Sequence, residues 1–294
     1  MKIVQTDEIP LKRALEHRGG IFHGRVMVEG APGTLDNFQI SFGQMGGDFN
    51  SPSHRHNFEQ IRYQLEGVLD HGRDGKLVQG MVGYFPEGVY YGPQSQDPSI
   101  NCKTIVLQFG GASGSGYLSQ AEVKAGMEEL KQEGEFKDGV FRRRAGVEGK
   151  RNLDGYQAIW EHVNQRPMVY PKPRYPQPIF MDPASYEWVP VEGAPGVAEK
   201  LLGVFTERRS EAGLLRLDAG ASYTARCKSI YVVVRGGGTV GDKTMRDLTT
   251  VYLDAGETVV ISARETTELL HFGLPNLAGV RMPEHDRVPA EAAE

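Results

Sequence analysis

Short apolar segments separated by turn residues dominate the first third of the chain. Examples are residues 21–28, 38–42 and 104–109, each bounded by Gly, Pro, Asp or Asn. Segments of this length and composition are typical of strands in a sandwich or barrel. A strand-like pattern returns at about Ile179 and continues to Leu274. The pattern therefore predicts a protein built mainly from β-strands.

A helical region is predicted between the two strand-rich regions. Ser119 and Glu122 have the spacing of a capping box, which marks the start of a helix. An apolar stripe continues from it at Val123, Met127 and Leu130. A second helix is expected over residues 154–166, and the prolines between Pro167 and Pro178 predict an extended connector.

These shifts in composition divide the chain into four parts, and the two strand-rich parts share one order of elements. In each, a strand ends in glycine (Gly67 or Gly236), and a turn leads to a second strand and another glycine (Gly80 or Gly256). We interpret this order as two copies of one β-domain. The expected parts are an N-terminal barrel with the candidate site at 1–112, a connector at 113–178, a C-terminal barrel at 179–278 and a tail at 279–294.

The feature with most chemical content is a pair of histidines, His54 and His56. In an extended segment, side chains two residues apart point to the same side. Two convergent imidazoles supply half of a typical transition-metal site. The alternative is a surface turn with two ordinary histidines.

The residues around this pair resemble the two sequence motifs of the cupin superfamily. The first cupin motif is His-x-His, three or four residues, Glu, six residues and Gly; the second is Gly, five residues, Pro-x-Gly, two residues and His. At the matching positions this chain has His54, His56, Gln60 and Gly67, then Gly80, Pro86, Gly88 and Tyr91. The spacing is kept, but Gln60 replaces the usual Glu and Tyr91 the usual His. In the second half, the matching ligand positions hold Tyr223, Ala225, Ser229 and Thr267.

The resemblance implies an all-β protein of two jelly-roll cupin barrels, joined by the helical and proline-rich linker. It implies a divalent transition metal in the N-terminal barrel, iron first, with Mn, Ni, Cu or Zn as alternatives. The ligands would be His54, His56, Gln60 and Tyr91. The second barrel would hold no metal. Tyr91 could instead be a proton donor or an aromatic wall of the pocket.

Two further residues could face the same cavity. Arg62 and Gln64 lie at the same strand parity as Gln60. A buried arginine there would need an anion, such as a substrate carboxylate. The alternative is an arginine on a solvated strand face. We therefore treat Tyr91, Arg62 and Gln64 as candidate catalytic residues.

The functional hypothesis is a metal-dependent enzyme that acts on a small organic substrate, with dioxygenase chemistry as the first class. A non-redox isomerase or lyase comes next, and a small-molecule binding or sensor protein without turnover is the third option. The net charge of −5 gives no reason to expect nucleic acid or a membrane surface as a partner. The two cysteines, Cys102 and Cys227, fit a cytoplasmic protein. The resemblance further implies a homodimer or an internal pseudo-dimer.

Overall fold

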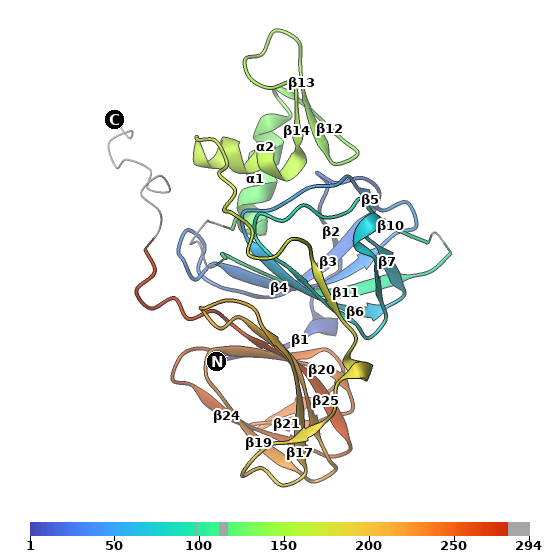
Figure 1. Cartoon of the computed structure of the whole chain (residues 1–294), viewed down its shortest axis with the longest axis vertical. Coiled ribbons are helices and arrows are strands. Elements are labelled where there is room, and N and C mark those ends of the chain that lie inside the picture. Colours follow the sequence, from blue (N-terminus) through green and yellow to red (C-terminus); the bar gives the residue numbers. More distant parts are fainter. Residues whose placement is uncertain (98, 112–116, 282–294) are drawn as a thin grey trace. The chain divides into compact units, whose positions relative to one another are not determined.

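The computed structural model describes residues 1–97, 99–111 and 117–281 (Figure 1). Strands are the main element, as the sequence predicts, and two α-helices occur among the described residues. The chain divides into two compact units. Unit 1 consists of residues 1–10, 25–28 and 181–278, and unit 2 consists mainly of residues 11–24 and 29–180. No helix among the described residues has the length and apolar character needed to cross a membrane.

Unit 2 contains most of a seven-stranded sheet in the order β15-β9-β6-β11-β4-β3-β2 and all of a four-stranded sheet in the order β5-β10-β7-β8. The central strand β6 pairs with β11 on one side and β9 on the other, which places Gln60 opposite Gln108 and Phe85. The bounds are β2 (Lys12–Arg13), β3 (Phe22–Glu29), β4 (Phe38–Met45), β5 (Asn50–Ser51), β6 (Glu59–Glu66), β7 (Val68–Asp70), β8 (Lys76–Val78), β9 (Val82–Phe85), β10 (Gln94–Gln96), β11 (Cys102–Phe109) and β15 (Ile179–Met181), with a 3-10 turn at Gly72–Asp74.

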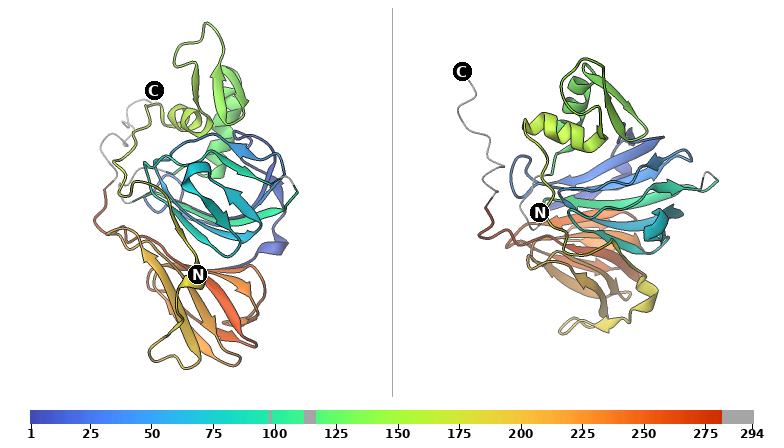
Figure 2. Two further views of the ribbon diagram at one scale, coloured as in Figure 1. Left: turned by 45° about the vertical axis from the view of Figure 1, so that its right-hand side comes forward. Right: turned by 45° about the horizontal axis from the view of Figure 1, so that its top comes forward.

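The region expected to be a connector is a folded part of unit 2. It contains α1 (Gln120–Leu130), α2 (Gly155–Asn164) and a three-stranded sheet made of β12 (Gly134–Lys137), β13 (Val140–Arg143) and β14 (Asn152–Asp154). Figure 2 shows the two helices together at one end of unit 2. Apolar side chains from both helices form a core with Phe58, which directly precedes β6. This shared core is why the region packs as part of the unit and does not act as a spacer.

The predicted starts of both helices agree with the structure. The Ser119 side chain accepts a hydrogen bond from the Glu122 amide, and the Glu122 side chain accepts one from the Ser119 amide, which completes the capping box. Asp154 caps α2 in a similar way, because its Oδ1 accepts from the amides of Tyr156 and Gln157. The glycine-rich residues 112–116 of the predicted linker lie outside the described residues.

Unit 1 repeats the arrangement of unit 2. Its seven-stranded sheet has the order β1-β23-β20-β25-β18-β17-β16, and its four-stranded sheet has the order β19-β24-β21-β22. The strand order matches that of unit 2 position by position, as expected for two copies of one β-domain. The bounds are β1 (Lys2–Gln5), β16 (Val189–Pro190), β17 (Val197–Val204), β18 (Glu211–Leu217), β19 (Ser222–Arg226), β20 (Ser229–Arg235), β21 (Gly238–Val240), β22 (Lys243–Met245), β23 (Thr249–Leu253), β24 (Thr258–Ala263) and β25 (Thr267–Gly273), with 3-10 turns at Thr6–Glu8 and Pro183–Ser185.

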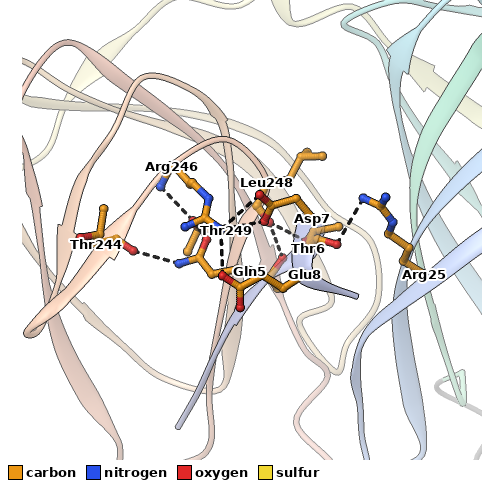
Figure 3. A network of polar contacts seen from close by, with 10 residues as sticks. Gln5, Thr6, Asp7, Glu8, Arg25, Thr244, Arg246, Leu248 and Thr249 are labelled. Carbon is orange, nitrogen blue, oxygen red and sulfur yellow. Dashed lines mark hydrogen bonds and ion pairs between the residues drawn. The ribbon is translucent and has the colours of Figure 1, made fainter. Parts of the chain in front are cut away.

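The first ten residues depart from the expected domain boundaries, because they belong to unit 1 and not to the barrel at 1–112. Strand β1 pairs antiparallel with β23, with Ile3 opposite Val251. Figure 3 shows the polar contacts that hold the segment after β1. The Thr6 hydroxyl donates to the Leu248 carbonyl at 2.7 Å, and Arg246 donates to Asp7 at 2.9 Å. Backbone pairing of this kind leaves no signal in a local sequence pattern.

Candidate functional site

The histidine pair lies in the segment that joins β5 to β6 in unit 2. His54 forms an isolated bridge with Tyr91, in which the backbone amide of each residue donates to the carbonyl of the other. This bridge brings the two sequence motifs together. Both imidazoles are buried, and their ring centroids lie 4.9 Å apart. His54 is oriented by the Pro52 carbonyl, which lies 2.7 Å from its Nδ1.

Gln60, Arg62 and Tyr91 form one buried hydrogen-bonded cluster. The Arg62 guanidinium donates to Gln60 Oε1 from Nε at 3.1 Å and from Nη2 at 2.6 Å. The same Nη2 lies 3.1 Å from the Tyr91 hydroxyl, and that hydroxyl donates to Gln60 Oε1 at 3.3 Å. Gln60 Oε1 therefore accepts from three donors. Its lone pairs are directed to the arginine and the tyrosine, so they are not available to a metal ion.

Arg62 has no carboxylate partner in the part of the chain that the structure describes. Its side chain is only 8% exposed, and its guanidinium carbon lies 4.4 Å from the centre of the Phe85 ring. Burial lowers the pKa of Arg62, but an arginine keeps its proton in proteins. An aromatic face offsets part of the cost of burying the charge. The rest of that cost is not compensated by a negative charge.

The two histidines and Tyr91, which lie in or beside this cluster, are neutral near pH 7. Burial lowers the pKa of His54 to about 3, and it lowers the pKa of His56 well below the ordinary value. Burial also raises the pKa of Tyr91, although Arg62 opposes that shift, so the hydroxyl keeps its proton. Arg62 is therefore the charged group of this cluster.

A cavity of about 190 Å³ lies beside the cluster, within unit 2. His54, His56, Gln60 and Arg62 all line it, so the structure brings together four of the residues chosen from the sequence. Tyr91 lies one layer behind the wall and reaches the cavity through its hydrogen bonds to Gln60 and Arg62.

Gln64 is placed elsewhere. It shares the strand parity of Arg62, but its Nε2 donates to the Glu66 carbonyl at 2.8 Å and contacts the Cys102 sulfur at 2.9 Å. It does not line the cavity. Alternate residues of β6 do point to the same side, as predicted. This alternation gives no information on how far along β6 the cavity extends. Gln64 therefore has no candidate role in this site.

Sequence reasoning missed the residues that close the cavity on its other sides. They come from the arm before β3 (residues 11–20) and from the helical region, and they include Leu15, His17, Arg18, Leu118, Val123, Met127 and Tyr156. Arg18 is buried and forms an ion pair with Asp154, the cap of α2, so arm and helical region are joined. The apolar stripe of α1 predicted the helix, but the sequence did not indicate that part of this stripe lines a cavity.

The residues present do not fit the four-ligand metal site that the resemblance implies. Two imidazoles are available, but Gln60 is occupied by Arg62, and Tyr91 is a protonated phenol. The Arg62 guanidinium, which is hydrogen-bonded to Gln60, would also repel a divalent cation bound beside Gln60. Among the described residues, no group of three or more His, Cys, Asp or Glu side chains could hold a metal ion.

Comparison with known proteins supports the fold. No family model matches the sequence, and no curated protein matches it. A candidate dioxygenase from Nostoc punctiforme superimposes with a TM-score of 0.64 at 12% identity, covering 96% of this chain and 85% of that chain. The pirin YhhW from Escherichia coli, solved in complex with nickel(II), gives 0.53 at 11% identity over 93% and 98%. A candidate glyoxylate-induced protein from Pseudomonas aeruginosa gives 0.56 at 10% identity over 90% and 84%.

These similarities extend over both units and concern structures with the cupin fold. The predicted all-β fold of two jelly-roll copies is therefore confirmed. At identities this low the shared property is the fold, and the activity must be argued from the site.

Proposed function

We propose that unit 2 binds a small organic anion, a carboxylate, in the cavity beside Arg62, without a divalent metal ion. The observation that carries this proposal is the buried guanidinium with no carboxylate partner among the described residues. A buried charge is costly unless an opposite charge and hydrogen bonds compensate it. A bound carboxylate would provide both, and the planar guanidinium is well suited to hold one.

The hydrogen bonds of Arg62 leave room for such a ligand. Nε and Nη2 are used by Gln60 and Tyr91, whereas no hydrogen bond to a described residue involves Nη1. Gln94 also lines the cavity, and its buried Nε2 has no hydrogen-bond partner among the described residues. These N–H groups are donors that an anionic ligand can use.

The entrance to the cavity has a matching charge. Three of the lining residues are exposed, so they mark where the cavity meets solvent: Arg13, Glu16 and Lys124. Two of them are cations and one is an anion. A positive entrance that leads to a buried cation favours the approach of anions.

Calorimetric titration with acetate, benzoate and their neutral amides tests the proposal. We expect binding of at least one acid, and no binding of the matching amide. Arg62→Gln should weaken acid binding about tenfold to a hundredfold, because a charged hydrogen bond contributes about 1.5–3 kcal/mol. Arg142→Gln, at an exposed position outside the cavity, is the control and should bind like the unchanged protein. Equal binding by the Arg62 variant would contradict the proposal.

A metal-dependent oxygenase is the second candidate, with an isomerase or lyase as its non-redox form. The observation in its favour is His54, whose Nδ1 is held by a backbone carbonyl, as the second nitrogen of metal-binding histidines is in many proteins. Metal analysis of the purified protein decides between the candidates. Stoichiometric iron, or Mn, Ni, Cu or Zn, that disappears in a His54→Ala/His56→Ala double variant would favour the oxygenase. Metal-free protein that still binds carboxylates would favour the first proposal.

A further inference from the structure

We infer that the ligand is a compact carboxylic acid with an apolar tail, and that the tail lies against helix α1. This inference rests on the proposed function and adds the shape of the ligand. Polar and apolar side chains both line the cavity, and α1 contributes apolar residues to its wall. The carboxylate would meet Arg62 on β6, and the tail would meet the apolar stripe of α1.

One face of α1 lines the cavity. Its lining residues are Gln120, Val123, Lys124 and Met127. Positions separated by three and four residues lie on one face of a helix. Val123 and Met127 thus present apolar side chains to the cavity, and the polar residues on the same face are the half-buried Gln120 and the exposed Lys124. Met127 is 4% exposed, so this face is a wall of the cavity and not an open surface.

The neighbouring surfaces extend this apolar wall. Leu118 lies just before α1, and Ala14 and Leu15 come from the arm before β3; all three line the cavity. Arg62, Gln60, His54 and His56 form a polar part of the lining, next to apolar residues of the strands such as Phe22, Met45 and Val106. A ligand that is charged at one end and apolar at the other matches a lining of this kind. Contact with the apolar wall contributes about 25 cal/mol per Å² of apolar surface removed from water.

The position of α1 is fixed by packing, so the apolar wall is a stable part of the site. Gly126 lies where α1 crosses α2, and a Cβ atom at that position would come within 2.6 Å of Val163 and 3.2 Å of Ile159. The close approach of the two helices therefore depends on glycine at this point. The capping box at Ser119 fixes the start of the same helix.

The cavity limits the size of the tail. Its volume of about 190 Å³ is below the range of roughly 300–1,000 Å³ that is usual for drug-sized ligands. A single ring or a short branched chain is therefore the expected tail. Fatty acids with long chains should not fit.

Affinities for a series of acids separate the contribution of the carboxylate from that of the apolar tail. Acetate and benzoate share the carboxylate but differ in apolar surface, so we expect benzoate to bind at least about tenfold more tightly. Met127→Gln and Val123→Trp should each weaken benzoate about tenfold or more and leave acetate within about twofold. Glu128→Gln, on the exposed side of α1, is the control and should change neither affinity. Circular dichroism and melting curves verify that each variant is folded.

The outcomes are distinguishable. Equal affinity for acetate and benzoate, or an equal loss of both in the α1 variants, would overturn the inference and leave the carboxylate site intact. Failure of every acid to bind the unchanged protein would overturn both the inference and the proposed function. Binding of a long-chain acid as tight as that of benzoate would also refute the size limit.

Discussion

At the scale of single residues, the site is defined by Gln60, which stands where the cupin motif that the sequence resembles has Glu. Gln60 accepts three hydrogen bonds but carries no charge, so it gives the guanidinium of Arg62 hydrogen bonds without compensating its charge. His54 and His56 lie in the segment before β6, so only the spacing of the resembled motif indicated that they lie near it. The sequence allowed Gln60 and Arg62 to be placed on one side of a strand, because strand periodicity determines direction. It could not show that Arg62 donates to Gln60, because that contact depends on side-chain conformation within the folded sheet.

A carboxylate introduced at position 60 should block the proposed anion site. In Gln60→Glu, the new carboxylate would form an ion pair with Arg62 at the present donor distances of 2.6 and 3.1 Å. We expect affinity for benzoate, measured by calorimetry, to fall at least about tenfold. Gln60→Met removes the acceptor without adding charge, and it should keep affinity within a fewfold. Unchanged affinity in the Glu variant would show that Arg62 does not anchor the ligand.

Acid should destabilise the protein through its buried histidines. Burial lowers the pKa of His17 from 6.5 to about 3, so below pH 6.5 the unfolded chain takes up a proton that the folded chain does not. The stability contribution is complete above pH 6.5 and is lost as the pH falls toward 3. His17→Gln should therefore flatten the pH dependence of the unfolding free energy by up to about 1.4 kcal/mol per pH unit in this window. Denaturant titrations from pH 4 to pH 7 measure the slope, and an unchanged slope would show that His17 titrates normally.

At the scale of elements, the main finding is that the predicted connector forms one side of the cavity. The capping box and the apolar stripe predicted the start of α1 correctly, and the helix ends at Leu130. Strand β12 begins soon afterwards, at Gly134. The sheet β12-β13-β14 was missed because its strands are short and β13 carries Arg142 and Arg143, which resemble a solvated turn.

Loss of the capping box should weaken both α1 and the site. Ser119→Ala removes the acceptor for the Glu122 amide, which should cost about 1 kcal/mol of stability. The affinity for benzoate should fall with it, because Val123 and Met127 lose their fixed position, whereas acetate binding should change less. Denaturant unfolding and calorimetry on one preparation provide both values. A stable variant that binds benzoate normally would show that the cap does not position the wall.

At the scale of the whole molecule, two copies of one strand order account for both units, and the sequence repeat predicted this. The strands at one edge of each large sheet were not predicted. In unit 1 this edge strand is β1, and at the equivalent position in unit 2 it is β15. Such pairings depend on which strand edge is open in three dimensions. The expected homodimer and cytoplasmic location stay predictions, and most of the predicted tail lies outside the described residues.

Removal of the first eight residues should destabilise unit 1 specifically. Ile3 packs against the core of that unit, and β1 covers the edge strand β23. We expect a loss of at least about 1 kcal/mol, because the partly buried Ile3 and the hydrogen bonds of β1 with β23 are removed together. The β23 amides should then exchange hydrogen faster than in the full chain. Arg246→Ala breaks only exposed ion pairs and should cost less than about 1 kcal/mol. Equal exchange in the truncated and full chains would contradict this role of β1.

The pairing of β1 with β23 also sets an order of events during protein synthesis. Strand β1 is made before residues 11–180, which form most of unit 2, and its partner near residue 250 is made after them. Unit 2 can therefore fold before β23 is made, whereas unit 1 cannot complete its sheet until β25 has been made as well. During that interval β1 is an unpaired strand. A chain that stops after unit 2 would keep this exposed strand permanently, and it would be prone to aggregate.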